Sequence, residues 1–273
     1  DGVPGVTQPA VEPGGSFVYE FTPKDAGTYW FHPHVRSSEQ VERGLFGVVV
    51  VEDRDPLPYS RDVVWVVDDW LLTPAGEIYP EFNTRHDLAH DGRWGNVVTV
   101  NGNRNEQLVV RPGERIRLRL VNVANGRVFA PDFGELNAKV IAVDGMYTAV
   151  PMKASGFELA PGNRLDLDIT VGSSDTGRQF AVIDGFFARQ PNRLAEIVVA
   201  GDLVETPGFV APSAAHMPEW RDTRTMTPSV EYRLNARRGG ELGIEWTLNG
   251  RAMSHATHSE SHDTSTLPLA GWK

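Results

Sequence analysis

The sequence predicts an all-β protein, and three observations lead to this prediction. Glycine and proline are plentiful, with 27 and 19 residues among 273, which suits a chain with many turns. β-Branched residues gather in short runs bounded by turn residues, as is typical of strands. Between residues 115 and 120, arginine alternates with isoleucine or leucine at every position, and this period of two indicates a strand.

Composition excludes several classes of protein. The formal net charge is −10, and nucleic acids and anionic membranes are bound mainly through excess Lys and Arg, so we expect neither as a partner. The chain has no run of about 18 apolar residues, so we expect no membrane-spanning helix. It has no cysteine, which excludes disulfides and thiolate ligands. Its length is sufficient for one large or two ordinary domains.

The first sixty residues read as short strands joined by turns. Residues 1–8 have the composition of a loop, and residues 16–21 alternate as a half-buried strand should. A second strand is expected at 27–34. Residues 48–51 are apolar at every position and predict a strand buried on both faces, whereas 54–60, with two prolines, predict a linker.

The central part of the chain predicts a longer series of strands. Ile116, Leu118 and Leu120 share one face of a strand, and three arginines share the other. Because the protein is acidic, we expect this arginine face to be solvated and paired with carboxylates. Strands are predicted within residues 62–70, 97–102, 107–122, 138–146, 159–170 and 194–199.

Two histidines stand out in the sequence Tyr-Trp-Phe-His-Pro-His. Successive side chains of a strand alternate, so His32 and His34 should point to the same side, about 6.6 Å apart along the strand. Pro33 cannot donate to a sheet ladder and favours an edge or a strand end, where side chains can reach a ligand. Neutral imidazole is a common metal ligand. The pattern fits a metal site, or two histidines on a polar rim.

Five other histidines are weaker candidates. His86 and His90 have the spacing of one helix face, but a catalytic zinc needs a third ligand, and such a pair is more often surface decoration. His255, His258 and His262 lie in a Ser/Thr-biased tail and could share a helix face and chelate a metal. Tails of this composition are more often disordered.

The stretch from Gly27 to Asp53 resembles the second copper-ligand motif of the multicopper oxidases. That motif places aromatic residues before His-x-His and continues through a Gly-Leu-x-Gly turn to an apolar strand that ends in an acidic pair. In that family both histidines bind the type 3 copper pair of a trinuclear cluster that reduces dioxygen to water. The resemblance implies this role for His32 and His34.

The resemblance extends to other segments. Residues 1–8 are similar to the family's segment after its first ligand motif, which implies that Asp1 is the carboxylate that assists proton delivery to oxygen. The Ile-Ala-x-Asp-Gly and Pro-Gly-x-Arg-x-Asp strings are similar to signatures of the family's second domain, which carries no copper ligand. The implied architecture is a series of tandem cupredoxin-like Greek-key β-barrels.

The resemblance also divides the chain into segments. Residues 1–53 would be the latter part of a first cupredoxin-like domain, 61–201 a second domain, and 202–230 a linker. Residues 231–273 would be the start of a third domain with a divergent tail. The first, third and fourth ligand motifs are not recognisable, and without cysteine the chain cannot build a type 1 copper site. We therefore expect a truncated member of the family.

Two classes of function follow. The first is a laccase-type oxidase that contains copper and takes single electrons from a small-molecule reductant, such as a phenol, an amine or a metal ion, and passes them to dioxygen. The second is a non-catalytic cupredoxin module that binds at most one metal or a protein partner. A homo-oligomer that shares ligands between chains is a third arrangement. Relatives are usually periplasmic or secreted, and we expect the same here.

Overall fold

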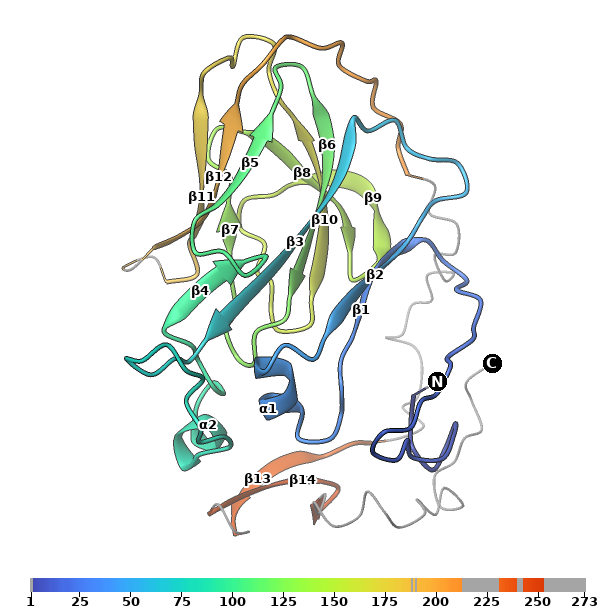
Figure 1. Ribbon diagram of the computed structural model, residues 1–273, viewed down its shortest axis with the longest axis vertical. Coiled ribbons are helices and arrows are strands. Elements are labelled where there is room, and N and C mark those ends of the chain that lie inside the picture. The colour runs from blue at the N-terminus through green and yellow to red at the C-terminus, as the bar shows by residue number, and fades with distance from the viewer. Residues whose placement is uncertain (1, 188, 190, 213–230, 240–242, 253–273) are drawn as a thin grey trace. The chain divides into compact units, whose positions relative to one another are not determined.

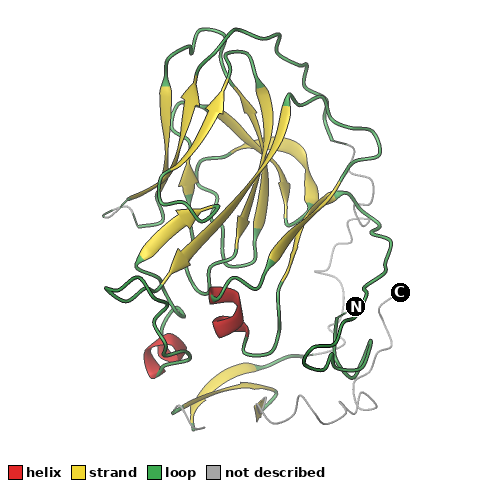
Figure 2. Ribbon diagram, in the orientation of Figure 1, coloured by secondary structure: helices red, strands yellow, loops and turns green. Residues whose placement is uncertain are grey.

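The computed structural model describes residues 2–187, 189, 191–212, 231–239 and 243–252. It divides the chain into two compact units, one of residues 24–221 and one that combines residues 1–23 with 222–273. Apart from two short helices, the regular elements of the described residues are strands, and the predicted all-β class is confirmed (Figure 2). Neither of the two helices in the described part is long and apolar enough to cross a bilayer.

The larger unit is built on two β-sheets that share one core (Figure 1). The six-stranded sheet has the order β4-β3-β6-β10-β8-β9, in which β3 and β6 are parallel and the other neighbours antiparallel. Its strands are β3 (Arg61–Trp70), β4 (Val97–Val100), β6 (Arg115–Asn122), β8 (Asn137–Val143), β9 (Met146–Lys153) and β10 (Arg164–Thr170).

The second sheet has four strands in the order β5-β12-β11-β7. They are β5 (Glu106–Val110), β7 (Pro131–Asp132), β11 (Gln179–Asp184) and β12 (Asn192–Val199), and β5 runs parallel to β12. Buried side chains of both sheets, such as Leu118 of β6 and Ile197 of β12, belong to one hydrophobic cluster. Burial of such residues is the main favourable contribution to folding.

The arginines of β6 are paired with carboxylates as expected, but they are buried rather than solvated, so that part of the prediction was wrong. Arg117 and Arg119 are each 2% exposed. Both donate to Asp166 of β10, Arg117 at 2.6 Å and Arg119 at 3.2 Å, and Arg119 also binds Asp62 at 2.6 Å. The buried Thr28 joins this network, since its hydroxyl donates to Asp166 at 2.6 Å and accepts from Arg119 at 2.7 Å.

Thr28 belongs to a hairpin that lies against this arginine face. Its strands β1 (Gly27–Phe31) and β2 (Gly47–Val51) pair with each other in a two-stranded sheet. Asp53, just beyond β2, accepts from Arg117 at 2.9 Å and from the Tyr147 hydroxyl at 2.7 Å. Burial would lower the pKa of Arg117, but the charge of Asp166 and these hydrogen bonds raise it above its usual value, so the guanidinium stays charged.

The prediction that residues 48–51 are buried on both faces was wrong. Val49 and Val50 of β2 are each more than a third exposed. The reason is that β1 is the strand with which β2 pairs in the described structure, so the other edge of β2 has no partner strand there, and Val49 and Val50, which point to opposite faces, are both exposed. A run of valines records high strand propensity, which does not by itself require burial.

A third correction concerns the smaller unit. Residues 16–21 form no strand, and Phe17, Val18 and Phe21 are exposed. The alternation of their sequence would need a partner strand to become a ladder, and no such pairing occurs in the described residues. The strands of this unit are β13 (Leu234–Arg238), β14 (Ile244–Leu248) and β15 (Arg251–Ala252), which form a three-stranded antiparallel sheet.

The larger unit also contains two short helices, α1 (Ser37–Glu42) and α2 (Arg85–Ala89). Glu42 anchors α1, because its carboxylate accepts from the backbone N–H of Leu71 at 2.9 Å and from Asn125 at 2.7 Å. The guanidinium of Arg93 lies 3.3 Å from the same carboxylate. These buried contacts attach the segment after β1 to the six-stranded sheet and to the connection that follows β3.

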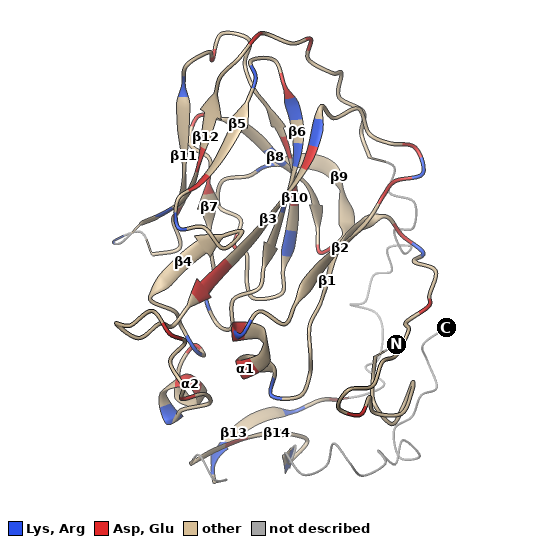
Figure 3. Cartoon of the chain, in the orientation of Figure 1, with Lys and Arg blue, Asp and Glu red and all other residues tan. Residues whose placement is uncertain are grey.

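A buried acidic cluster lies at the end of β3 (Figure 3). Asp68 and Asp69 are both buried, and the carboxylate of Asp69 pairs with the Nε of Arg127 at 2.8 Å. For Asp68, burial raises the pKa to about 8, with further contributions from Asp69 and Glu42, although the Asp69 N–H partly opposes the shift. The folded protein therefore retains a proton on Asp68 that the unfolded chain loses above about pH 4.

The buried arginine face yields a stability prediction. Asp166→Ala should lower the free energy of unfolding by about 3–5 kcal/mol, because it leaves two buried guanidiniums without their shared carboxylate. Urea denaturation measures the change. The matched control is Glu39→Ala, which breaks the partly exposed Arg43–Glu39 pair on α1 and should cost about 0.5 kcal/mol or less. Equal losses in the two variants would contradict the structural role of Asp166.

Asp68 yields a pH prediction. Its folded pKa is raised, so its contribution to stability is present at low pH and is lost as the pH rises from about 4 through about 8. Asp68→Asn should reduce that loss and be more stable than wild type at pH 8, because the amide stays neutral and can still accept from the Asp69 N–H. Denaturant unfolding at pH 5 and pH 8 measures both effects. Asp202→Asn, at an exposed site, should change neither, and parallel pH profiles for wild type and Asp68→Asn would refute the assignment.

Candidate metal centre

The aromatic side chains at the end of β1 form a column. The Trp30 and His32 rings stack at 4.2 Å between centroids and 22° between planes, and the His32 and His34 rings at 4.7 Å and 21°. β1 ends at Phe31, before the expected end at residue 34, but the stacking shows that these three side chains share one side of the chain. His32 is half-buried and His34 is exposed. The structure therefore places two imidazoles side by side.

Glycine turns of the six-stranded sheet's unit hold β1 in place. A Cβ at Gly27 would lie 2.6 Å from the carbonyl oxygen of Gly145, so only glycine permits this close approach of β1 to the β8–β9 turn. A Cβ at Gly162 would lie 3.4 Å from the Trp30 ring. Arg164 adds a hydrogen bond from its Nε to the Thr28 carbonyl at 3.1 Å. The sheet thus positions the base of the aromatic column.

The turn between α1 and β2 fixes the other end of the hairpin. Gly44 has a φ of 86°, and its N–H donates to the Val41 carbonyl while that of Leu45 donates to the Gln40 carbonyl. These two bonds form a Schellman motif, which ends a helix with a glycine in the left-handed region. The motif redirects the chain so that Gly47 pairs with Phe31. The Gly-Leu-Phe-Gly sequence therefore sets where β2 returns beside β1.

A backbone contact decides which His32 nitrogen is available. His32 Nδ1 lies 3.2 Å from the Pro33 carbonyl oxygen. A carbonyl only accepts hydrogen bonds, so this contact requires the proton on Nδ1 and leaves the Nε2 lone pair free. A hydrogen bond of this kind commonly orients a metal-binding histidine. His32 is thus in the tautomer that a metal at Nε2 needs.

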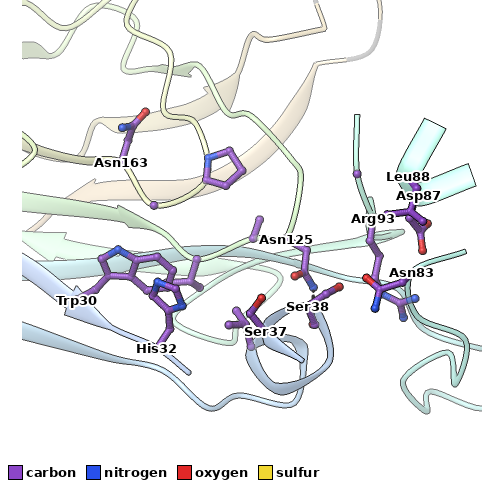
Figure 4. A pocket seen from close by; sticks show the side chains of 16 residues that line it. Trp30, His32, Ser37, Ser38, Asn83, Asp87, Leu88, Arg93, Asn125 and Asn163 are labelled. Atoms are coloured by element: carbon purple, nitrogen blue, oxygen red, sulfur yellow. Dashed lines mark hydrogen bonds between the residues drawn. The ribbon is translucent and has the colours of Figure 1, made fainter. Parts of the chain in front are cut away.

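His32 and Trp30 also line a cleft of about 630 Å³ (Figure 4). Ser37 and Ser38 of α1 lie beside His32 in this cleft, and Asp87 and Leu88 of α2 belong to its opposite side. Its lining mixes polar side chains with an indole and aliphatic groups. The cleft gives small molecules access to the half-buried histidine.

The described residues supply an incomplete set of metal donors. Within them no group of three or more His, Asp or Glu side chains is arranged to hold a metal ion. Imidazole suits copper, so the donors that are present fit this metal, but two of them make only part of a coordination sphere. Asp1, His255, His258 and His262 lie outside the described residues.

The prediction that His86 and His90 share one helix face is confirmed. His86 lies in α2 and His90 caps its C-terminal end, and their rings are 4.6 Å apart. Both are exposed, and the structure does not bring them together with His32 and His34 as a metal-binding group.

Sequence reasoning missed the part that Trp30 plays. Alternation of side chains already placed Trp30 on the same side as His32, two residues away, and this signal could have predicted the stack. The contact with the Pro161–Gly162 turn could not have been predicted in this way, because it joins segments more than 130 residues apart.

Comparison with known proteins identifies the family. Two multicopper oxidase family models match the chain, at residues 1–56 and 61–200. The iron transport multicopper oxidase fio1 of Schizosaccharomyces pombe is 30% identical over 184 residues, or 67% of this chain and 29% of its own length. The multicopper oxidase MmcO of Mycobacterium tuberculosis is 26% identical over an alignment of 294 positions, which covers 91% of this chain and 56% of that protein.

A solved structure agrees. The crystal structure of a multicopper oxidase from Pseudomonas thermotolerans matches with a TM-score of 0.74 and 31% identity, covering 86% of this chain and 55% of that one. The chain thus spans between about a quarter and somewhat more than half of the length of the proteins it matches. Because the matched models cover most of its residues and the fold agrees, this chain belongs to the multicopper oxidase family.

Proposed function

We propose that this chain provides the second histidine pair of a copper centre in a laccase-type oxidase. Such an enzyme would couple one-electron oxidation of phenols, amines or metal ions to the reduction of dioxygen to water. The observation that carries the proposal is the pairing of two imidazoles at 4.7 Å, one with its Nε2 free, in the motif that matches the family. Copper would supply the one-electron redox chemistry.

The geometry of the pair supports binding to two neighbouring ions. An imidazole lone pair lies in the plane of its ring, and the planes of His32 and His34 are nearly parallel. Their lone pairs therefore point into separate, roughly parallel planes instead of converging on one point. This is consistent with the type 3 role that the resemblance implies for His32 and His34.

Other parts of the proposal rest on motif similarity. Asp1 would deliver protons to oxygen, a general-acid role that a carboxylate can fill. The type 1 site, which needs a cysteine, would be missing from this chain. We propose a location in the periplasm or outside the cell because members of the family are usually periplasmic or secreted.

One observation favours an alternative function. The described residues hold two imidazoles at this centre and no third donor. Metal sites bind tightly when their coordination sphere is complete. A non-catalytic cupredoxin module that binds at most one metal ion or a protein partner would fit this donor set.

The test is copper content by mass spectrometry after reconstitution with Cu(II) and dialysis against excess EDTA. Wild type should keep copper, and His32→Ala/His34→Ala should lose it, because both proposed ligands are gone. His86→Ala/His90→Ala is the matched control, since it removes two histidines elsewhere and should retain the chelator-resistant copper. Oxygen uptake on a phenolic substrate, run in parallel, separates a working centre from a binding site. Wild type without stoichiometric copper would favour the non-catalytic module.

We also propose that the chain forms homo-oligomers. The uncovered edge of β2 and its exposed valines are a site where strands of another copy can pair. Size-exclusion chromatography with light scattering should show a mass that rises with protein concentration. Val49→Lys, which places a charge on that strand, should shift the distribution toward monomer. A wild-type monomer at every concentration would contradict this proposal.

A further inference from the structure

A second pair of histidines lies at α2, with His86 in the helix and His90 as its C-cap residue. His86 and His90 have ring centroids 4.6 Å apart and an angle of 39° between their planes. The helix is fixed at its start by a reciprocal capping box, in which the Thr84 side chain accepts from the Asp87 N–H and the Asp87 carboxylate accepts from the Thr84 N–H. The spacing of the pair is therefore set by a capped turn of helix.

Neither imidazole is used for another polar interaction in the described structure. Both side chains are exposed, and in the described part of the chain their rings lie against each other and make no side-chain hydrogen bond or ion pair. His32, in contrast, stacks on Trp30 and bonds to a carbonyl. The ring nitrogens on α2 are thus free for an external ligand.

The surroundings favour a cation. The connection that contains α2, residues 73–96, carries Glu77, Glu81, Asp87 and Asp91 against Arg85 and Arg93, so carboxylates exceed guanidiniums by two. Arg93 is buried and directs its Nη atoms at the carbonyls of Glu81 and Tyr79, so it does not face a surface ligand. The connection that carries the pair therefore has a net negative charge, which attracts cations.

We propose that His86 and His90 form a two-nitrogen chelate for Cu(II) at the protein surface, separate from the centre at His32 and His34. Residues four apart on a helix present their side chains on one face, and the tilt between the rings lets both lone pairs turn toward one ion. Cu(II) accepts a tetragonal set of nitrogen and oxygen ligands and lies at the top of the Irving–Williams order, so two imidazoles with water can hold it. A structural zinc site would need four protein ligands.

The site lies beside the cleft that His32 lines. Asp87 and Leu88, between the two histidines in sequence, contribute to the opposite side of that cleft (Figure 4). The chelate does not depend on the proposed oxidase function, because it needs neither dioxygen nor the His32–His34 centre.

The test is Cu(II) titration of the full chain with a weak competing chelator, followed by electron paramagnetic resonance. Wild type should bind one Cu(II) more than His86→Ala/His90→Ala, with nitrogen splitting from two imidazoles. Each single variant should bind that ion about 100-fold more weakly, since the second ligand then no longer acts intramolecularly. Equal Cu(II) binding by wild type and the double variant would overturn the proposal.

A respaced variant provides the matched control. His90→Ala/Asp91→His keeps the number of histidines but moves one off the shared helix face, so it should bind like His90→Ala. Copper binding as strong as wild type in this variant would also overturn the proposal, because it would mean that any two nearby histidines suffice. Both substituted positions are exposed, and an unchanged thermal midpoint confirms that the variants are folded. Zn(II) in the same competition should bind more weakly than Cu(II).

Discussion

The carboxylate of Asp166 is the point on which the arrangement of this chain depends. It lies between Arg117 and Arg119 and also accepts a hydrogen bond from Thr28, so one buried acid joins β10, β6 and β1. A buried ion pair contributes little net stability over an apolar contact, but its hydrogen bonds have direction. We infer that these hydrogen bonds mainly position β1, because Thr28 can bond to both Asp166 and Arg119 in only one register of this strand.

That register carries through to the candidate centre. Thr28 and Trp30 are two residues apart, as are Trp30 and His32, so fixing the first fixes the side on which the others lie. The close approach of Gly27 to Gly145 and the contact of Trp30 with Gly162 keep β1 close to the turns that precede β9 and β10. The imidazoles are therefore held by a chain of packed groups that begins in the buried ion network and ends at the exposed ring of His34.

How far the sequence predicts this structure differs between its parts. The sequence pattern located five strands of the six-stranded sheet but missed β9, and the period of two on β6 reflects a hydrophobic core on one side. The same pattern could not tell what covers the arginines, since a buried ion network and a solvated face have identical periodicity. Residues 16–21 and 48–51 show the same limit. Alternation and valine content indicate a propensity to form a strand, whereas burial depends on partner strands elsewhere in the chain.

The two histidine pairs show why residue spacing alone does not decide function. Their ring separations, 4.7 and 4.6 Å, are nearly the same. One pair is stacked on an indole, lies beside a cleft and has its tautomer set by a carbonyl, whereas the other stands free on a capped helical turn. Side chains held in one orientation suit a centre whose ligands must keep one geometry. Side chains that can still rotate suit a site where an ion binds and leaves. The difference lies in what surrounds each pair, and it arises from contacts that link distant segments.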